Sequence, residues 1–329
     1  MLRFTLWAIV VVLFGVLGTG ASMAKERSLS LLSSFPENFA FTEAIGMEFI
    51  RRIEELSEGE ISVSLSGPEV VPPFEGLEPA QAGLYDILFT HGAYHSGTTG
   101  VGLAIDGMAT DPALRRSSGA MDYIDAHYQK LGMKFVSSPC AGTKGLRFYL
   151  RQEIDNSSKF SGLKIRGTEP YNVIIRELGG SPVLMSGGEI YSSMQKGIID
   201  GAAFPVLGAK GYKWYEVASY YSEPKYGQTC FIILVNLDVW NSLDQDEQNL
   251  ISKVGQDLEV ETIPLVDRMV EEETSALREL GMKPTIFPAE VTDNLEALWS
   301  EGVWQVAVKK SGEDAQKLRD IARDAGLSN

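Results

Sequence analysis

The sequence predicts an α/β fold built from two domains, and three observations support this prediction. Short apolar segments that are typical of strands alternate along the chain with longer segments of helical periodicity. A chain of 329 residues is long enough to bury a large core, and chains of this size commonly divide into two domains. No repeat, low-complexity run or basic tail interrupts the pattern, so we expect a chain that is compact throughout.

The first residues have the features of a secretory signal peptide. Met1–Arg3 precedes the apolar-rich run Phe4–Leu17, and the small-residue site Ser22–Ala24 follows it. The run is too short for a comfortable membrane span, and no cysteine near the cleavage site suggests a lipid anchor. We expect residues 1–24 to be removed and the mature periplasmic protein to begin near Lys25, without stable membrane insertion. An uncleaved N-terminal anchor is the alternative.

The charge of the chain excludes several classes of partner. The sequence has 44 Asp and Glu against 29 Lys and Arg, which gives a formal net charge of −15 at pH 7. Nucleic acids and anionic membrane surfaces are negatively charged as well and repel so acidic a chain. We therefore expect neither as a partner.

The two cysteines, Cys140 and Cys230, would enter an oxidising space after export. They can form one disulfide or remain two separate buried thiols, because a sequence does not fix the distance between their Cα atoms. Neither belongs to a close Cys or His pair of ligand spacing, which argues against metal binding by them.

Elements of the first half alternate in the order expected for a parallel sheet. The apolar strand Leu29–Leu32 is followed by a helix from about Phe39 to Glu58, and a strand Ile61–Leu65 follows that helix. A short helix then leads to the strand Ile87–Thr90. We expect parallel strands here. A helix from Ala113 to Leu131 and the strand Lys134–Ser137 continue the pattern.

Loops that follow the carboxyl ends of such strands are where ligands usually bind. This rule indicates three segments, Ser34–Asn38, Glu69–Phe74 and His91–His95. Glu69 and Phe74 bound the second of them, and both are candidates for contact with a ligand.

His91 and His95 have the i, i+4 spacing of a helical metal site. Gly92 weakens a helix there, however, and no Glu lies between the two histidines as it does in a zinc protease. We expect no metal site. Tyr94 and His91 are candidates for lining a cleft, and a merely structural loop is the alternative.

Two strand-like pieces in the middle of the chain each carry an arginine among apolar neighbours. Arg147 lies in Leu146–Leu150, and Arg166 ends Leu163–Arg166. A buried guanidinium needs hydrogen-bonded anionic compensation. Either an internal Asp or Glu or a bound anion can supply it.

The segment after Arg166 has a recognisable order. A helix from Glu169 to Leu178 is closed by two glycines, a short strand Pro182–Met185 follows, and a second helix runs from Glu189 to Lys196. The turn Gly197–Gly201, with the sequence GIIDG, comes next.

These residues resemble the signature region of the solute-binding proteins of TRAP transporters, the dicarboxylate-binding type. The shared elements are the GLKIRG strand with Arg166, the Glu189-x-Tyr191 pair and the Gly-x-x-Asp-Gly turn. The order of the N-terminal half is similar as well, and the resemblance covers most of the mature chain, thinning between residues 98 and 120. It implies a two-lobed periplasmic binding protein fold with an interdomain cleft.

The resemblance also implies a binding site. Arg166 would grip the ligand carboxylate, with Glu189 and Tyr191 nearby. Arg147 stands nineteen residues earlier, roughly where some members have a second arginine, and would either supply a second cation or brace the site from behind. Phe204 stands where the family usually has an Asn, so that a polar contact would be lost and an aromatic wall gained.

An aromatic stretch, Val206–Tyr221, follows the Gly-x-x-Asp-Gly turn. Such a stretch is more often core packing than ligand wall, but Trp214 is a candidate for lining the cleft beside Phe204. Beyond it, the strand Cys230–Val235 would cross back to the first lobe.

The last third of the chain looks structural. We expect a long bracing helix from about Asp244 to Gly281, broken or bent around Pro264, then a helix Val291–Lys309 and a polar tail. The implied division places 25–144 and about 228–268 in lobe I, with 145–227 and about 269–329 in lobe II.

The function implied is that of a periplasmic receptor that binds an organic acid and delivers it to TRAP membrane subunits. No nucleophile turn, phosphate loop, dinucleotide turn or zinc-protease helix is present in the sequence, and we expect no catalysis and no cofactor. A secreted hydrolase that uses a carboxylate pair and a structural envelope protein are the alternatives. We expect a monomer. The identity of the acid and a bridging metal stay open.

Overall fold

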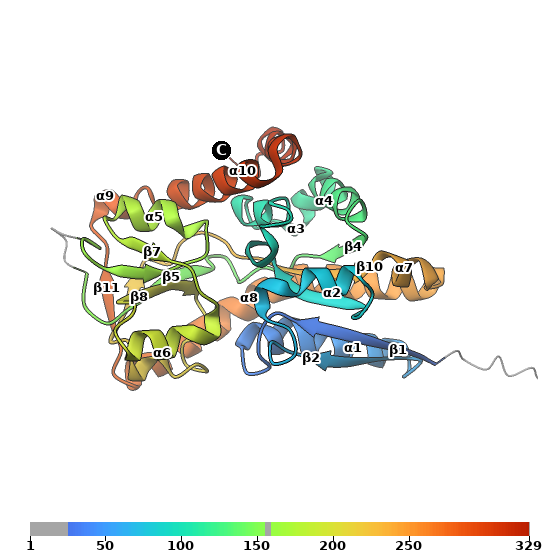
Figure 1. Ribbon diagram of the computed structural model, residues 1–329, viewed down its shortest axis with the longest axis horizontal. Helices are drawn as coiled ribbons and strands as arrows, with labels where there is room; N and C mark the ends of the chain where they lie inside the picture. The colour runs from blue at the N-terminus through green and yellow to red at the C-terminus, as the bar shows by residue number, and fades with distance from the viewer. Residues whose placement is uncertain (1–25, 155–158, 329) are drawn as a thin grey trace, which may run out of the picture.

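The computed structural model describes residues 26–154 and 159–328. Two lobes, each built on its own β-sheet, lie side by side (Figure 1). The mixed α/β, two-lobed fold expected from the sequence is confirmed. The signal peptide, by contrast, lies outside the described residues, and the lobe boundaries stay a prediction. No helix in the described ranges is long and apolar enough to cross a membrane.

The first lobe contains a five-stranded sheet. β1 pairs in parallel with β2 and β3, as expected, whereas β10 enters from the second lobe and runs antiparallel to both β3 and β4. The strand order is β2 (Ile61–Ser66), β1 (Arg27–Ser33), β3 (Ile87–His91), β10 (Phe231–Asn236) and β4 (Met133–Ser137).

The second lobe contains a six-stranded sheet. β6 is parallel to β7 and β8, while β5, which arrives from the first lobe, is antiparallel to β8 and β9. The parallel strands expected in the first half of the chain are present, and the two strands that cross between the lobes, β5 and β10, run antiparallel to their neighbours. The order is β11 (Lys283–Ile286), β9 (Tyr220–Glu223), β5 (Leu146–Leu150), β8 (Gly201–Pro205), β6 (Lys164–Arg166) and β7 (Ser181–Val183).

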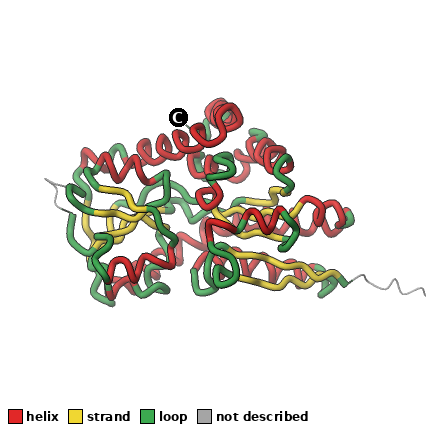
Figure 2. Tube along the Cα trace, in the orientation of Figure 1, coloured by secondary structure: helices red, strands yellow, loops and turns green. Residues whose placement is uncertain are grey.

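Short helices flank both sheets (Figure 2). The helix expected over 113–131 is two helices, because Gly119 adopts a left-handed conformation with φ of 81°. Helices of the first lobe are α1 (Glu48–Leu56), α2 (Leu77–Gln81), α3 (Pro112–Ser117), α4 (Ala120–Gln129) and α7 (Leu237–Ser242). Those of the second lobe are α5 (Tyr171–Glu177), α6 (Ile190–Gln195) and α9 (Ala289–Thr292).

The long helix α8 (Gln245–Glu279) braces both lobes. Glu259 accepts hydrogen bonds from Arg116 and from the Ser138 amide in the first lobe. Thr274, further along, accepts from Arg147 in the second. Pro264 does not end the helix, which continues to Glu279, and Val266 and Val270 beyond the proline are buried in the core.

The C-terminal helix α10 (Leu295–Asp324) also spans both lobes (Figure 1). The expected polar tail is wrong, since the helix continues through a kink at Gly312, where φ is 48°. Ala315, Leu318 and Ala322 recur on one face after the kink and are buried in a core cluster of the first lobe. Three small or medium apolar residues were too weak a pattern to predict this.

Cys140 and Cys230 form a disulfide between the two segments that cross between the lobes. The sequence allowed either a disulfide or two separate thiols, and the structure has the disulfide. The Arg115 guanidinium lies beside it, with Nη1 2.9 Å from Cys140 Sγ and Nη2 donating to the Met108 carbonyl at 2.8 Å. Burial lowers the pKa of Arg115 to about 10, so the group stays charged at neutral pH.

Candidate functional site

A hollow between the lobes collects the ends of strands from both sheets. β1 and β3 end beside it, and β10 starts there because Phe231 pairs with His91. Arg166 ends β6, and β8 ends at Pro205. Carboxyl ends of strands thus meet where α/β proteins usually bind ligands. The lining residues are Phe35, Phe39, His91, Tyr94, Arg166, Thr168, Tyr171, Phe204, Pro205, Thr229 and Phe231.

Arg166 is the buried cation of this hollow, with 2% of its surface exposed. Its Nε donates to the Met185 carbonyl at 3.0 Å, and Nη1 donates to the Ala203 carbonyl at 3.0 Å. The guanidinium carbon lies 5.4 Å from the ring centre of Phe204. Within the described ranges no carboxylate forms an ion pair with it. Carbonyls and a ring face orient the group, but they do not neutralise its charge.

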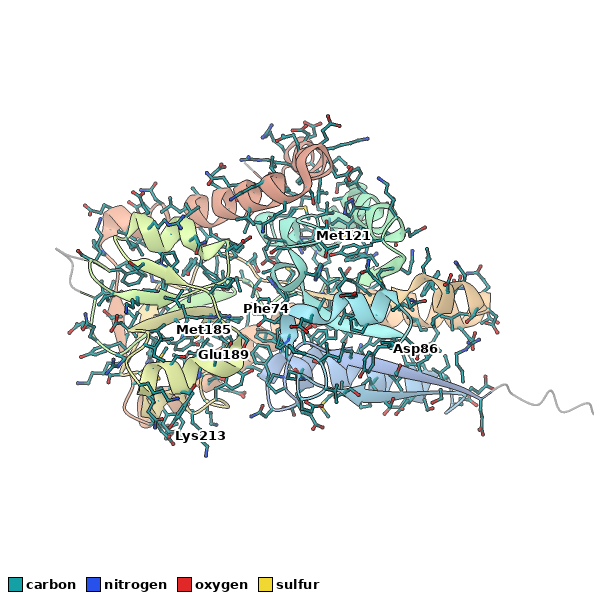
Figure 3. The ribbon with its side chains drawn as sticks, in the orientation of Figure 1. Phe74, Asp86, Met121, Met185, Glu189 and Lys213 are labelled. Carbon is teal, nitrogen blue, oxygen red and sulfur yellow. A yellow bond between two sulfur atoms is a disulfide. The ribbon has the colours of Figure 1, made fainter. Side chains whose placement is uncertain are left out.

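Tyr94 reaches this cation from the opposite lobe. Its hydroxyl oxygen accepts hydrogen bonds from Arg166 and from the Gly187 amide of the second lobe. Burial raises the pKa of Tyr94, and the Arg166 charge and the Gly187 N–H oppose that rise without cancelling it. The phenol therefore stays neutral. Phe74 packs on the Tyr94 ring with centroids 4.7 Å apart, and Figure 3 shows Phe74 at the inner end of the first lobe.

His91 lines the hollow with both ring nitrogens occupied. Nδ1 accepts from the Ala93 amide at 3.1 Å, so the proton lies on Nε2. Nε2 is 2.9 Å from Asp106 Oδ2 and 2.9 Å from Thr229 Oγ1. Asp106 is itself fixed by the Cys230 amide at 2.8 Å. These contacts fix the orientation of the imidazole ring.

His95 does not join His91 in a metal site. Its Nε2 is 2.6 Å from the Tyr128 hydroxyl, and burial lowers the pKa of His95 to about 3. Among the residues that the structure describes, no three His, Cys, Asp or Glu side chains converge as metal ligands.

Arg147 lies outside the lining of the hollow. It is 1% exposed, and Nη2 is 3.3 Å from Glu223 Oε1 while Nη1 is 3.2 Å from Thr274 Oγ1. Its guanidinium carbon is 4.8 Å from the centre of the Tyr221 ring. Of the two partners considered for a buried arginine, an internal carboxylate or a bound anion, Arg147 has the internal carboxylate. Its contact with a ligand stays a prediction.

Glu189 and Tyr191 have partners at the surface of the second lobe. Glu189 accepts from the Ser186 amide and hydroxyl and so caps the turn before α6, and Figure 3 shows it near Met185. Tyr191 donates to Glu216 at 2.5 Å. Neither lines the hollow, so their contact with a ligand also stays a prediction.

Glu69 and Trp214 complete the set predicted from the sequence. Glu69 closes its own loop by accepting from the Gly67 amide at 2.7 Å. Trp214 is fully buried behind Phe204, with ring centres 4.7 Å apart. It supports the wall rather than forming its surface.

Several residues that line the hollow were not individually predicted from the sequence. Phe35 falls in the loop 34–38 that the strand-end rule indicated, and Phe39 follows directly. Thr168, Tyr171, Thr229 and Phe231 had no signal, because an aromatic or a threonine beside a strand looks the same in a core and in a wall.

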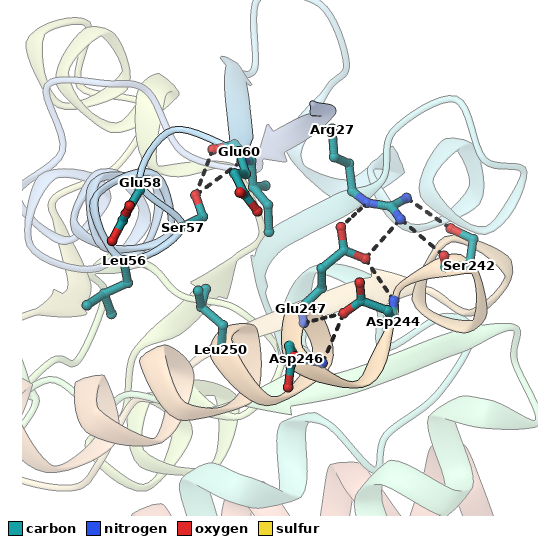
Figure 4. A pocket seen from close by; sticks show the side chains of 11 residues that line it. Arg27, Leu56, Ser57, Glu58, Glu60, Ser242, Asp244, Asp246, Glu247 and Leu250 are labelled. Carbon is teal, nitrogen blue, oxygen red and sulfur yellow. Dashed lines mark hydrogen bonds and ion pairs between the residues drawn. The ribbon is translucent and has the colours of Figure 1, made fainter. Parts of the chain in front are cut away.

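A larger hollow of about 420 Å³ lies at the other ends of the first-lobe strands (Figure 4). The basic residue of its lining, Arg27, is paired: it donates to Glu247 at 2.7 Å and also to Ser242, while Asp244 and Glu247 cap α8. It therefore holds no uncompensated cation for an acid, and it lies far from the ends where ligands usually bind.

The sequence matches the family described as bacterial extracellular solute-binding protein, family 7 (DctP), over residues 34–309. A monocarboxylate 2-oxoacid-binding periplasmic protein of Nostoc sp. is 24% identical, over 75% of this chain and 71% of that protein. The ectoine-binding periplasmic protein TeaA of Halomonas elongata is 24% identical over 51% of this chain, and the match spans only half of that relative's length.

Solved structures share the fold. A Bordetella pertussis extracytoplasmic solute receptor binding pyroglutamic acid has a TM-score of 0.78 at 16% identity, over 90% of this chain and 99% of that one. A TRAP periplasmic solute-binding protein from Desulfovibrio salexigens with bound orotic acid has a TM-score of 0.77 at 17% identity, over 91% and 98%. The resemblance seen in the sequence is confirmed, and the chain belongs to the bacterial extracellular solute-binding protein family 7, a family of solute receptors.

Proposed function

We propose that this solute receptor binds an organic acid in the hollow between its lobes, with the acid's carboxylate on Arg166. The observation that carries the proposal is a guanidinium that is almost fully buried and has no ion-pair partner in the described ranges. A carboxylate matches its fork through two parallel charge-assisted hydrogen bonds, which supplies the missing charge and fixes the ligand's orientation.

Ligand entry requires the lobes to part. In this arrangement the hollow holds about 30 Å³, which is room for about two water molecules. An organic acid is larger, so it enters an open form and the lobes then close on it, with Tyr94 meeting Arg166 across the gap. Closure excludes water and strengthens the contact between the charges.

Ligands of similar structures support an acid. The Bordetella pertussis and Desulfovibrio salexigens proteins bind pyroglutamic and orotic acid, and another, from Bordetella bronchiseptica, was found with calcium and picolinate. All three ligands are small carboxylic acids. A closed, loaded receptor would then deliver the acid to TRAP membrane subunits from the periplasm, acting as a monomer.

A hydrolase with a carboxylate pair is the less favoured function. Acid and base catalysis of that kind needs two carboxyl groups facing the substrate. The residues that line the hollow include no Asp or Glu, and Asp106 behind them is committed to His91 and the Cys230 amide. Binding without catalysis fits this wall better.

A thermal-shift screen of the purified protein against monocarboxylates, dicarboxylates, sugar acids and aromatic acids tests the proposal. Ligand at a hundredfold excess over its dissociation constant adds about 2.7 kcal/mol to the free energy of unfolding, which is a readable shift. Arg166→Ala should abolish the shift, with a loss of about 2–5 kcal/mol of binding free energy.

Arg151→Ala is the matched control, because Arg151 is an exposed arginine of the same lobe. Its shift should equal that of the unmodified protein. A hit that survives Arg166→Ala unchanged, or no hit across the whole panel, would contradict the assignment.

A further inference from the structure

The wall of the hollow is dominated by aromatic rings from both lobes. They are in mutual contact: the Phe35 ring centre lies 5.3 Å from those of Phe39, Tyr94 and Phe231. The Phe39 ring lies 5.8 Å from Phe204 of the opposite lobe. Flat apolar groups are favoured between such faces, and each ring contact adds to the area buried. The six aromatic residues in the lining are Phe35, Phe39, Tyr94, Tyr171, Phe204 and Phe231.

The wall provides for one anionic group. Arg166 is the cation among the lining residues, and His91 is the one other basic side chain there. His91 cannot serve as a second cation, because Nδ1 accepts from Ala93 and Nε2 is engaged by Asp106 and Thr229. A protonated His91 would have to give up the Ala93 bond.

The position of Arg166 determines where the rest of a bound acid would lie. Arg166 is stacked beside Phe204, and the Tyr94 hydroxyl bonds to the same guanidinium from the first lobe. A carboxylate on Arg166 therefore projects the rest of its molecule between Phe204 on one side and the Phe35–Phe39 pair on the other. Gly187 packs closely on the Phe204 ring, since a Cβ there would lie 3.1 Å from that ring.

The geometry points to a compact monocarboxylate with a flat, apolar ring as the substrate class of this receptor, an inference that rests on the proposed function. A second carboxylate would be buried among rings without a cation, and the hydroxyls of a sugar acid would lose their water partners. Each unsatisfied polar group of this kind weakens binding about tenfold. We expect the wall to select against both.

Isothermal titration of the purified protein with benzoate, succinate and glucuronate tests the class. Benzoate carries one carboxylate on a flat ring, succinate has two and no ring, and glucuronate has one on a hydroxylated ring. Benzoate should bind at least about tenfold tighter than either. Phe39→Leu and Phe204→Leu, which remove a ring and keep an apolar side chain, should each weaken benzoate about three- to tenfold.

Phe41→Leu is the matched control, because Phe41 is a buried ring that contacts Phe39 but does not line the hollow. It should leave the affinity for benzoate unchanged. Two ring variants keep the test decisive if one of them does not fold.

The outcomes separate the two proposals. Tighter binding of succinate or glucuronate, lost in Arg166→Ala, would overturn the ring-acid class and leave the receptor function standing. Benzoate binding that neither ring variant weakens would also overturn the class. If none of the three acids binds in a way that depends on Arg166, and the wider acid panel is silent too, the receptor site itself is wrong.

Discussion

Arg147 and Arg166 are equally buried and belong to the same sheet, yet their surroundings differ in one respect. Arg147 has Glu223 at 3.3 Å, and its charge also acts on Glu273 of α8. Arg166 has two backbone carbonyls and a ring face. Burial alone therefore does not distinguish a structural arginine from one that binds a ligand. The presence or lack of a nearby carboxylate does.

The topology explains the difference. β8 lies between β5 and β6, and Phe204 of β8 is the register partner of Arg147. Arg147 lies on the side of Phe204 that faces β9 and α8, which supply Glu223 and Thr274. Arg166 is the last residue of β6, on the other side of Phe204, where the strand ends at the hollow.

The two arginines should respond oppositely to the same substitution. Arg147→Met leaves the Glu223 carboxylate without its cation and removes the contact with Tyr221. Glu223 is 30% exposed, so we place the loss of stability below that of a fully buried pair, at about 2 kcal/mol. Arg166→Met removes a buried charge that pairs with no carboxylate in the described part of the chain, so stability should stay equal or rise. Urea unfolding of both variants measures this.

Both variants should be compared with the unmodified protein in the same buffer without added organic acid. A bound acid would stabilise the proteins that keep Arg166 but not the Arg166→Met variant. An equal loss of stability in the two variants would show that the guanidinium of Arg166 is as much a part of the fold as that of Arg147.

Substitution by lysine should distinguish the two arginines through their effect on ligand affinity. Arg166→Lys keeps a positive charge but loses the planar fork, and we expect the affinity for the acid identified by the screen to fall by about 1.5 kcal/mol. Arg147→Lys should leave that affinity unchanged, because the side chain does not line the hollow. Titration calorimetry of the two lysine variants measures the difference. A loss in Arg147→Lys as large as that in Arg166→Lys would place both arginines at the ligand.

A smaller effect is expected at the carboxylate that pairs with Arg147. Glu223→Gln keeps an oxygen near Nη2 but removes the negative charge, and because the pair is partly exposed the loss should be about 1 kcal/mol of unfolding free energy. Its control is Glu189→Gln, which alters a capping carboxylate of the same lobe far from Arg147. Ligand affinity should be unchanged in Glu223→Gln. A weaker ligand affinity there would argue that Arg147 and its partner position the site.

Much of the fold was predictable because its strands are apolar runs with clear ends. The ranges of β5 and β10 were expected to within a residue, and Arg166 was found because a charge inside such a run is conspicuous. β8 was missed because Gly201, Ala202 and Ala203 have little strand preference. β9 and β11 were missed because they are short and partly polar. Their extended conformation depends on pairing in the folded sheet rather than on a local sequence pattern.

The site was predictable in outline for a different reason. The strand-end rule and the family resemblance led to Arg166, Phe204, Tyr94 and His91, which the structure brings into one wall. The sequence favoured Arg166 over Arg147 but did not reveal the internal partner of Arg147, because Glu223 lies 76 residues from it in an unpredicted strand. Asp106 was not predicted either, because its contact with His91 joins residues that are fifteen positions apart and no pattern in the sequence pairs them.

The smallest expected effect is a pH dependence confined to the neighbourhood of Arg147. Glu273 accepts from the Gly208 and Lys210 amides, and burial raises its pKa above the ordinary 4.5, while those amides and the Arg147 charge oppose the rise. Between the ordinary and the raised pKa the native state binds more protons than the unfolded state. Stability contributed by this group is therefore lost as the pH rises through that window.

Glu273→Gln should remove that contribution and keep an oxygen for the two amides. His95 acts in the opposite direction, since burial lowers its pKa to about 3 and the group destabilises the protein as the pH falls below about 6.5. The measurement is accordingly the difference in unfolding free energy between variant and unmodified protein from pH 4.5 to 7, which should grow in favour of the variant by no more than about 1 kcal/mol. Arg147→Met should enlarge the pH dependence of Glu273, because it removes a charge that lowers this pKa, and Arg166→Met should leave it unaltered. If Arg166→Met shifted it equally, the two guanidinium groups would share one electrostatic environment, and the contrast between a paired and an unpaired arginine would fail.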